Sequence, residues 1–370
     1  MKIAHVAPLY ESVPPRLYGG TERIVSFLTE ELVAQGHEVT LFASGDSLTR
    51  ARLIAPCPRA LRLESSIDMM AHHILLLEKV FGMSAEFDVI HFHIDYLHYP
   101  LSRRLGIVNL TTLHGRLDIP DLVPLYREFR EMPVVSISDA QRLPLLWANW
   151  QGTVHHGLPE HLYRFHGEPG QYLAFLGRIS PEKRVDRAIE IARECGIPLK
   201  IAAKVDKVDQ EYFDTSIRHL LSDPLIEYLG EIGDREKESF LGNALGLLFP
   251  IDWPEPFGLV MIESLACGTP VIAYRRGSVP EVLEEGVTGF MVHDQAEAIK
   301  AVKSLESLSR RRCREAFEQR FSATRMVREY LRLYEEQVHA EDVRRAGPTL
   351  RRLYEEGEIH DGDRPERRTE

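Results

Sequence analysis

The sequence predicts an α/β protein built from two doubly wound halves. The 370 residues are about twice the usual length of one domain. Short apolar segments alternate with longer segments of helical periodicity from end to end, which is typical of parallel strands joined by helical crossovers. Two such series of strands are separated by a stretch rich in Gly, Pro and His, HHGLPEHLYRFHGEPGQ (155–171).

The first series begins at the N-terminus. Its candidate strands are KIAHVAP (2–8), HEVTLFA (37–43), FDVIHFH (87–93), IVNLTTL (107–113) and PVVSIS (133–138). Between the first two, Ile24, Leu28 and Leu32 recur at helical spacing. A helix is expected there, and Gly36 provides its C-terminal stop.

The second series provides the other sheet. Its candidate strands are QYLAFLG (171–177), PLKIAAKV (198–205), IEYLGEI (226–232), ALGLLFP (244–250), TPVIAY (269–274) and TGFMVH (288–293). We expect an N-terminal domain over residues 1–167 and a C-terminal domain over 168–322. We also expect a helix over 323–342 that packs back across the domains and a charged, mobile tail over 343–370.

The composition is that of a soluble globular protein, with 44% apolar and 27% charged residues. No apolar run approaches the roughly 20 residues of a membrane span, and the start, MKIAHVAP, is too brief for a secretory signal. We therefore expect a cytoplasmic protein with no transmembrane segment and at most peripheral membrane contact. A net charge of −11 argues against a nucleic-acid partner, because nucleic-acid binding depends on a basic surface. The cysteines lack C-x-x-C spacing, which argues against a zinc site.

The segment WPEPFGLVMIESLACGTPVIAY (253–274) has the signals of a short helix over residues 256–267, with Pro256 in its first turn and Gly268 after its end. In such a helix the N–H groups of Phe257, Gly258 and Leu259 have no intrahelical partner. We therefore expect these N–H groups to bind phosphate or sugar hydroxyls.

Two glutamates, Glu255 and Glu263, stand eight positions apart in this segment. Eight helical positions correspond to about 12 Å, so the two carboxylates cannot form the close pair of a glycosidase. This spacing favours separate roles at the two ends of one elongated ligand. In the alternative, Glu255 only caps the helix and Glu263 lies on its solvent-exposed face.

The segment FLGRISPEKRVDRAIEIA (175–192) predicts a strand followed by a helix that Ser180 caps and Pro181 begins. Arg178 and Lys183 flank this turn. Two cations and unpaired amides at the carboxyl end of a parallel strand are suited to a diphosphate. A solvated basic turn is the alternative.

A glycine pair, Gly19 and Gly20, lies between the first strand and the first helix, in YGGTER (18–23). Backbone amides in such a loop can approach a phosphate, although a tight turn would also require glycine. The loop lacks the G-x-G-x-x-G spacing of a dinucleotide site and the lysine of a P-loop.

Histidines cluster in HFHIDYLH (91–98) and TTLHGRLD (111–118). Alternation places His91 and His93 on one face of a strand, but no third ligand stands at a usable spacing, so no metal site is predicted. His114 follows a strand directly and precedes Gly115, so it is expected in the cleft rather than in the core.

Together these motifs resemble those of the retaining GT-B glycosyltransferases of family four. The resemblance rests on GRISPEK (177–183), the E-x7-E run EPFGLVMIE (255–263), SLACGTPVIA (264–273), the glycine pair of YGGTE (18–22) and LHG (113–115). It extends over about residues 1–335, and the E-x7-E run joined to GTPVIA is its most specific part. It implies the GT-B architecture, with two Rossmann-like domains that face a central cleft.

The resemblance also implies a nucleotide-diphospho-sugar donor, a UDP- or GDP-sugar, held mainly by the C-terminal domain. In such enzymes the residues that match Arg178 and Lys183 bind the diphosphate, and the residue that matches Glu263 binds the ribose hydroxyls. The chain departs from the family pattern at LKIAAKVDK (199–207), where many members have a glycine-rich loop. Ala202, Ala203 and Lys204 stand there instead, which leaves the contacts to the base and the phosphates open.

The resemblance assigns catalytic roles to Glu255 and His114. Glu255 addresses the donor sugar together with the amides of residues 257–259, and His114 lies at the reacting face. Gly19 and Gly20 approach the diphosphate from the N-terminal domain. The implied reaction is transfer of a hexose with retention of its anomeric configuration, without a metal or another cofactor, to a sugar, lipid or small-molecule acceptor.

Two other functions remain open at this point. A sugar-nucleotide epimerase of the same fold would convert the donor without any acceptor. A non-catalytic protein could bind the nucleotide-sugar without turnover, although the presence of His114 and both glutamates argues against it.

Overall fold

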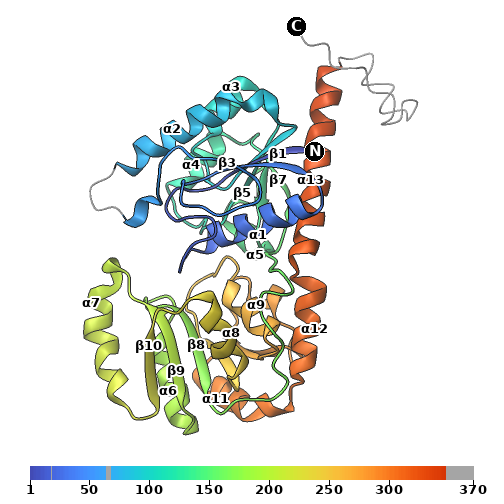
Figure 1. Cartoon of the computed structure of the whole chain (residues 1–370). Helices are drawn as coiled ribbons and strands as arrows, with labels where there is room; N and C mark the ends of the chain where they lie inside the picture. Colours follow the sequence, from blue (N-terminus) through green and yellow to red (C-terminus); the bar gives the residue numbers. More distant parts are fainter. Residues whose placement is uncertain (18, 64–67, 347–370) are drawn as a thin grey trace.

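The computed structural model describes residues 1–17, 19–63 and 68–346, which form two parallel sheets flanked by helices (Figure 1). The first sheet has the order β3-β2-β1-β4-β5-β6-β7 and the second the order β10-β9-β8-β11-β12-β13. Both are doubly wound, because the strand order reverses beside β1 and beside β8. Open sheets of this kind bind ligands beyond the carboxyl ends of the strands at that reversal.

The strands of the first sheet are short: β1 (Lys2–Val6), β2 (Glu38–Phe42), β3 (Arg52–Ile54), β4 (Val89–Phe92), β5 (Asn109–Thr112), β6 (Val134–Ser136) and β7 (Trp150–Thr153). Those of the second sheet are β8 (Leu173–Arg178), β9 (Leu199–Lys204), β10 (Ile226–Gly230), β11 (Gly246–Phe249), β12 (Val271–Tyr274) and β13 (Gly289–Val292). Every strand predicted from the sequence is present. β3 and β7 were missed because both are short edge strands whose side chains are only partly buried.

Helices cover both sheets. Those of the N-terminal half are α1 (Gly20–Ala34), α2 (Met69–Gly82), α3 (Tyr99–Leu105), α4 (Leu122–Glu128) and α5 (Asp139–Arg142). Those of the C-terminal half are α6 (Val185–Cys195), α7 (Gln210–Tyr212), α8 (Asp234–Gly242), α9 (Leu259–Ala266), α10 (Val279–Val282), α11 (Gln295–Ser304) and α12 (Arg310–Arg320). The last helix, α13 (Ala323–Arg345), packs on the N-terminal half. The first predicted helix is confirmed as α1, and Gly36 follows it with a φ of +87°.

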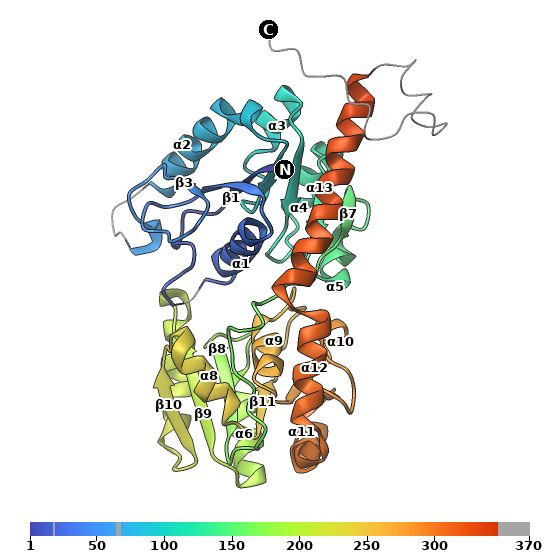
Figure 2. The ribbon, with the colours of Figure 1, turned by 45° about the vertical axis from the view of Figure 1, so that its right-hand side comes forward.

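The chain crosses between the halves twice, and the two crossing segments are hydrogen-bonded to each other. The N–H of Leu158 donates to the carbonyl of Phe321 at 2.9 Å, and the N–H of Ala323 donates to the carbonyl of Leu158 at 2.8 Å. Gly157 permits this contact, because a Cβ there would lie 2.3 Å from the carbonyl oxygen of Ser322. After the second crossing α13 runs beside the N-terminal half and packs against α1, as Figure 2 shows.

Helix α13 extends to Arg345, so the residues just beyond 342 are helical and not the start of a tail. The rest of the predicted tail lies outside the described residues. Among the described helices, none combines the length and the apolar character needed to cross a bilayer.

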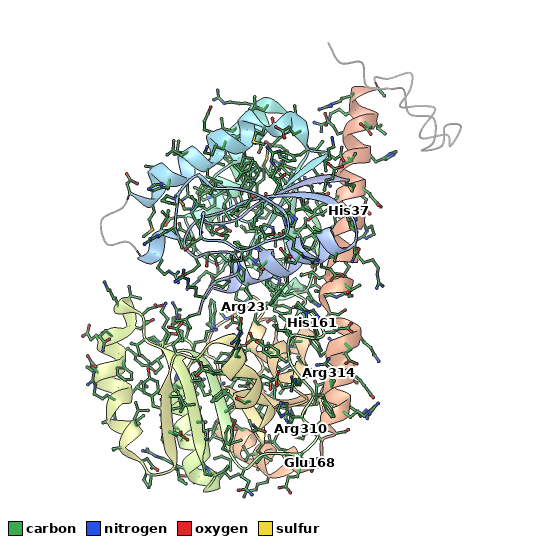
Figure 3. All side chains as sticks on the ribbon, in the orientation of Figure 1. Arg23, His37, His161, Glu168, Arg310 and Arg314 are labelled. Carbon is green, nitrogen blue, oxygen red and sulfur yellow. The ribbon has the colours of Figure 1, made fainter. Side chains whose placement is uncertain are left out.

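A buried arginine fixes the first crossing to the C-terminal half. Arg310, labelled in Figure 3, is 6% exposed. Its guanidinium donates to four acceptors: the carbonyl oxygens of His166, Ala244 and Gly242 at 2.7, 2.8 and 2.7 Å, and the hydroxyl of Thr269 at 2.6 Å. Every hydrogen bond it makes is internal, so Arg310 ties the segment after β7 to the helices beneath the second sheet.

Candidate active site

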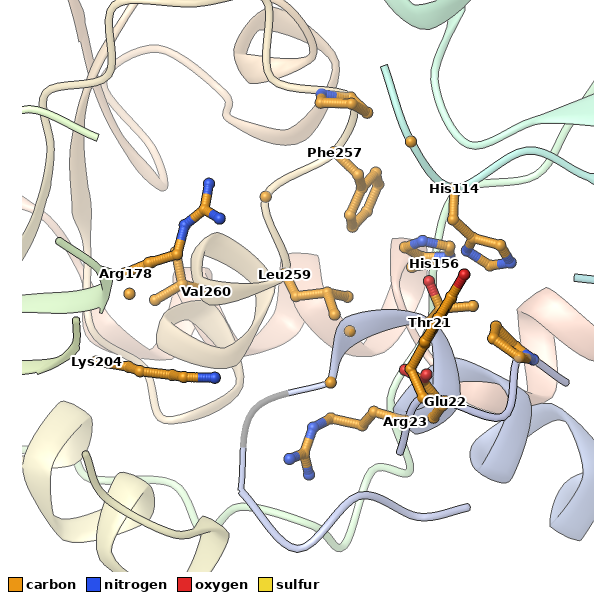
Figure 4. Close-up of a pocket in the computed structure, with 18 of the residues that line it drawn as sticks. Thr21, Glu22, Arg23, His114, His156, Arg178, Lys204, Phe257, Leu259 and Val260 are labelled. Carbon is orange, nitrogen blue, oxygen red and sulfur yellow. The ribbon is translucent and has the colours of Figure 1, made fainter. Parts of the chain in front are cut away.

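A cleft of about 860 Å³ lies between the carboxyl ends of the two sheets (Figure 4). Its walls include the ends of β4, β5, β8 and β9, together with the starts of α1 and α9. The structure brings every predicted site residue to this cleft: Gly19, Gly20, His114, Arg178, Lys183, Glu255, Phe257, Gly258, Leu259 and Glu263. Their roles stay predictions.

Helix α9 begins three residues later than predicted, at Leu259 rather than at Pro256. The reason is Gly258, which precedes it with a φ of +80° and so cannot belong to a right-handed helix. A Cβ there would also lie 2.9 Å from the Met261 side chain. The estimate of 12 Å between the two glutamates therefore does not apply, since Glu255 is not on the helix.

The start of α9 still offers unpaired donors. Within the described part of the chain, the N–H groups of Phe257, Gly258 and Leu259 have no hydrogen-bond acceptor. They lie on the cleft wall at a helix N-terminus, where the backbone carries partial positive charge. This arrangement suits phosphate or hydroxyl oxygens of a ligand.

Glu255 is held in the loop before α9 and is 8% exposed. Its carboxylate forms an ion pair with Lys183 and accepts from the indole Nε1 of Trp253 at 2.9 Å. Gly277 packs directly behind it, because a Cβ at that position would lie 2.4 Å from the backbone nitrogen of Glu255. Glu255 is therefore fixed by its backbone and by two donors, and it does not cap the helix.

Glu263 lies in α9 and is 3% exposed, so the alternative of a solvent-exposed helix face is wrong. It accepts from Lys237 Nζ at 2.9 Å and from the hydroxyl of Tyr163 at 3.3 Å. Lys237 comes from α8, and Tyr163 from the crossing between the halves. The two glutamates thus have separate donors, as two separate roles would require.

Arg178 ends β8, and carboxylates surround its guanidinium. The nearest oxygens belong to Glu182 at 2.7 Å, Asp206 at 3.5 Å and Asp209 at 3.8 Å. Lys204, at the end of β9, adds a further cation 2.9 Å from Asp206. The basic turn expected from the sequence is therefore largely neutralised by its own acidic neighbours.

These neighbours affect one another's protonation. Burial alone would raise the pKa of Asp206, but the hydrogen bond and charge of Lys204 and the charge of Arg178 hold this pKa below its ordinary value. Burial raises the pKa of Asp209, against the charge of Arg178. An incoming phosphate has to compete with these carboxylates for the same cations.

The turn after β8 also differs from the prediction at Ser180. The hydroxyl of Ser180 has no partner among the described residues, and α6 begins only at Val185. Arg184 stands before it with a φ of +53°. Ser180 therefore does not cap the helix, and residues 181–184 form a turn that brings Lys183 to the cleft.

The glycine pair lies where the two halves meet. A Cβ on Gly19 would lie 2.7 Å from the Cβ of Pro15, and a Cβ on Gly20 would lie 3.6 Å from the Leu259 side chain. Gly20 begins α1 and Leu259 begins α9, so two helix N-termini face the same part of the cleft. Next to them, Arg23 of α1, labelled in Figure 3, lies at the boundary between the halves. It forms an ion pair with Asp234 of α8 in the other half.

His114 follows β5 and contacts two other histidines. Its Nε2 lies 2.9 Å from Nδ1 of His93, and its ring stacks on that of His156 with the centroids 5.4 Å apart. His156 in turn packs edge-on against Phe257. Burial lowers the pKa of His114 to about 3, so its ring is neutral near pH 7.

The structure also places a third histidine, His5, beside His91 and His93, because β1 pairs with β4 so that His5 faces His91. The sequence spacing could not show this neighbour. Hydroxyl groups, however, take up both nitrogens of His5 and both of His91; they belong to Thr29, Thr112 and Tyr334. This is the hydrogen bonding of core histidines, and we assign no metal to the cluster.

Several residues that line the cleft were not predicted: Lys204, Lys237, His156, Trp253 and Arg23. Lys204 stands at the end of a predicted strand, and this position could have identified it as a cleft residue. Trp253 stands two residues before Glu255. Lys237 and Arg23 are brought in only by the packing of α8 and α1, for which the sequence carries no short-range signal.

Two family models match the chain. The model described as Glycosyl transferases group 1 matches residues 164–320, and the one described as Glycosyltransferase Family 4 matches residues 18–137. A D-inositol 3-phosphate glycosyltransferase of Mycobacterium leprae is 32% identical over 155 residues, which is 38% of this chain and 34% of that protein. The chain thus matches less than half the length of this relative.

Solved structures share the fold at low sequence identity. A glycosyltransferase involved in avilamycin A biosynthesis has a TM-score of 0.71 and 22% identity, over 92% of this chain and 98% of that one. Anabaena HepE in complex with UDP-glucose has a TM-score of 0.68 and 15% identity, over 92% and 100% of the two chains. Since the two family matches fall on the two halves that face the cleft, the chain belongs to the glycosyltransferases of the GT-B fold.

Proposed function

We propose that the protein is a retaining glycosyltransferase that moves a hexose from a UDP- or GDP-sugar to an acceptor hydroxyl. One observation supports this most directly. The unpaired N–H groups at the start of α9 lie in the same cleft as Glu255, Glu263 and the cations Lys183 and Arg178. A nucleotide-diphospho-sugar presents a ribose, a diphosphate and a sugar in that order, and the cleft wall has a suitable group for each.

In this proposal Glu263 binds the ribose. Lys237 and Tyr163 hold its carboxylate in place, and its remaining lone pairs can accept from the two ribose hydroxyls. The structure of Anabaena HepE was determined with UDP-glucose, which favours UDP as the first nucleotide to test here.

The diphosphate would lie between the start of α9 and the end of β8. Breaking the bond between the anomeric carbon and the diphosphate leaves negative charge on the nucleotide. Lys183, Arg178 and the N–H groups of residues 257–259 would stabilise that charge more strongly in the transition state than in the ground state. These protein groups would supply the positive charge that a metal ion supplies in metal-dependent transferases.

Glu255 would accept from hydroxyls of the donor sugar. It is 8% exposed and is oriented by Lys183 and Trp253. The side chain of Glu255 is therefore already fixed before the sugar binds, and its ordering adds little to the entropy cost of binding. The acceptor, a sugar, a lipid or a small molecule, would enter along the wall of the N-terminal half. Tyr10, Asp95 and Arg62 line the cleft on that side.

The proposal is tested by calorimetric titration of the protein with UDP, GDP and ADP, each in EDTA and again with magnesium. We expect micromolar affinity for UDP or GDP in EDTA. Absence of binding without magnesium would contradict the metal-free diphosphate site.

A second measurement tests the reaction. The protein is incubated with the matching nucleotide-sugar and a panel of acceptors, and NMR follows the anomeric proton of the product. We expect a product with the anomeric configuration of the donor. Inversion would contradict the retaining mechanism, and conversion of the donor without an acceptor would indicate an epimerase.

A further inference from the structure

A row of four alternating charges connects the N-terminal half to Glu263. Arg23 of α1 forms an ion pair with Asp234 of α8, and Nζ of Lys237 lies 3.5 Å from Oδ1 of the same aspartate. Lys237 in turn donates to Glu263 at 2.9 Å. Arg23 is the member of this row that belongs to the N-terminal half, and Glu263 is the residue proposed above to bind the ribose.

Arg23 is held tightly at the boundary between the halves. Its side chain is 4% exposed, and besides Asp234 its guanidinium donates to the carbonyl oxygen of Leu17 at 2.7 Å. Arg23 also lines the cleft, as Figure 4 shows. Since a buried charge that loses its partner is costly, the contact between the halves and the pairing of Asp234 depend on each other.

Asp234 has one carboxylate oxygen in use and one to spare. Its Oδ2 faces Arg23, whereas its Oδ1 is buried and has no hydrogen-bond partner among the described residues. The 3.5 Å to Lys237 is too long for a good hydrogen bond. Asp234 and Lys237 are three positions apart on one helix, a spacing at which opposite charges pair readily. Oδ1 is therefore an acceptor that Lys237 can reach but does not use.

Lys237 thus lies between two carboxylates and is closer to Glu263. Among the described residues, Lys237 is the one cation that pairs with Glu263, whose other donor is the hydroxyl of Tyr163 at 3.3 Å. If Lys237 turned to Asp234, Glu263 would keep only that hydroxyl. A nearly buried carboxylate would then lack the charged donor that fixes its orientation.

We propose that Arg23 is a positioning residue for the nucleotide site of the other half: by pairing with Asp234, it leaves Lys237 to hold Glu263 for the ribose. When the halves move apart and Arg23 withdraws, Asp234 takes Lys237. Nucleotide binding and the approach of the halves are then coupled. The ribose contact rests on the proposed function, whereas the choice of Lys237 between two carboxylates is a property of the protein without ligand.

Crystal structures of the ligand-free full chain test the choice of Lys237 first. We expect Nζ of Lys237 to contact Glu263 in the wild type and Oδ1 of Asp234 in Arg23→Met. If Arg23→Met does not fold, Arg23→Gln takes its place, because it removes the charge but keeps a donor for the carbonyl of Leu17. Lys237 still bonded to Glu263 in the variant would overturn the proposal, whether or not the protein binds a nucleotide.

Calorimetry with UDP and with 2′,3′-dideoxy-UDP tests the consequence for binding. Arg23→Met should weaken UDP binding about 5- to 20-fold, within the usual range for coupling between two sites. The dideoxy compound keeps both phosphates but lacks the hydroxyls that Glu263 would bind, so its loss should be smaller. An equal loss for the two ligands would show that Arg23 acts on the diphosphate and would overturn the proposal.

A second substitution tests the competition for Lys237. Adding Asp234→Asn to Arg23→Met removes the competing charge, so most of the UDP affinity should return. Arg23→Lys keeps a cation for Asp234 and should retain most of the wild-type affinity. A double variant that binds UDP as weakly as Arg23→Met would show that Asp234 does not compete for Lys237, and the proposal would fall.

Arg193→Met is the matched control. Like Arg23, Arg193 donates to one aspartate, Asp223 at 2.7 Å, and to one carbonyl oxygen, that of Leu220 at 3.3 Å, but it is not among the residues that line the cleft. It should leave UDP affinity unchanged, and a loss equal to that of Arg23→Met would overturn the proposal. If the wild type binds no UDP, the proposed nucleotide site fails, and the crystal structures still decide this inference.

Discussion

Lys183 and Glu255 form an ion pair on the cleft wall, and the ammonium of Lys183 also lies 5.3 Å from the centre of the Trp253 ring. The two side chains are 16% and 11% exposed. Lys183 comes from the turn after β8 and Glu255 from the loop before α9. The pair therefore joins the segment predicted to bind the diphosphate to the segment predicted to bind the sugar. A substitution of either residue should affect both segments.

We expect Lys183→Ala to lower kcat by about 10²- to 10³-fold, the usual effect of removing one group that stabilises developing negative charge. The melting temperature should change little, because the pair borders a cleft that is open to water. Steady-state kinetics and differential scanning fluorimetry measure the two effects. Near-normal turnover in Lys183→Ala would show that Lys183 does not stabilise the charge on the departing nucleotide.

Arg178→Ala should weaken UDP binding, and the loss should depend on salt. The substitution leaves Glu182, Asp206 and Asp209 without their shared cation, so that they repel the diphosphate as well as failing to attract it. Titrations at low and high salt measure the effect, which should be smaller at high salt because screening weakens the repulsion. Arg218→Ala is the control. Arg218 forms an exposed ion pair with Asp214 elsewhere on the same half, so its loss should leave UDP binding unchanged.

Glu263→Gln should weaken binding of the nucleotide itself, by roughly 10- to 100-fold, because the hydrogen bonds lost involve a charged group. The amide keeps the shape of the side chain but can accept through only one oxygen. Calorimetry with UDP measures this without any acceptor. Glu236→Gln, in α8 and directed at the backbone of Gly233, is a matched control away from the cleft. Equal affinities for the two variants would show that Glu263 does not contact the nucleotide.

The sequence could predict the strands and the identity of the residues at the cleft, because both depend on short-range signals. Apolar runs mark each buried strand, and residues at the carboxyl ends of parallel strands converge. It could not predict the start of α9, which depends on the positive φ of Gly258. Nor could it show that Asp206 and Asp209 surround Arg178, since that contact depends on the pairing of β8 with β9.

The same limit applies to the histidines. His91 and His93 were placed on one strand face, but His5 joins them only through the register of β1 on β4. Tyr334 then reaches His5 and His91 from α13, more than 240 residues further along the chain. Contacts that depend on strand order and on a returning helix have no counterpart in local spacing.

Arg310→Met should destabilise the fold by about 3 kcal/mol or more, because it leaves buried carbonyl oxygens without a donor. Urea unfolding measures this free energy. Arg310 does not line the cleft, so the KM for the donor should stay the same at a temperature where the variant is folded. This contrast with Lys183→Ala separates stability from function. A variant as stable as the wild type would mean that water replaces the guanidinium.

Stability should fall steeply as the pH drops below about 6.5, because several histidines are held neutral inside the fold. Burial lowers the pKa of each of these below its ordinary value: His5, His91, His93, His98, His114 and His156. The unfolded chain binds protons at these rings near pH 6.5, whereas the folded chain does not. The stabilisation is therefore fully present above pH 6.5 and is lost as the pH falls toward the folded pKa values, to about 3 for His5 and His114.

Each such histidine should cost about 1.4 kcal/mol of the free energy of unfolding between pH 7.5 and 5.5. Urea titrations at these two pH values measure the change. His98→Gln, which cannot gain a proton, should lose less stability over this range than the wild type, by about the share of one histidine. His219, on a segment at the protein surface, provides the control, because His219→Gln should keep the wild-type slope. A free energy of unfolding that is the same at both pH values would show that the buried rings take up protons without unfolding the chain.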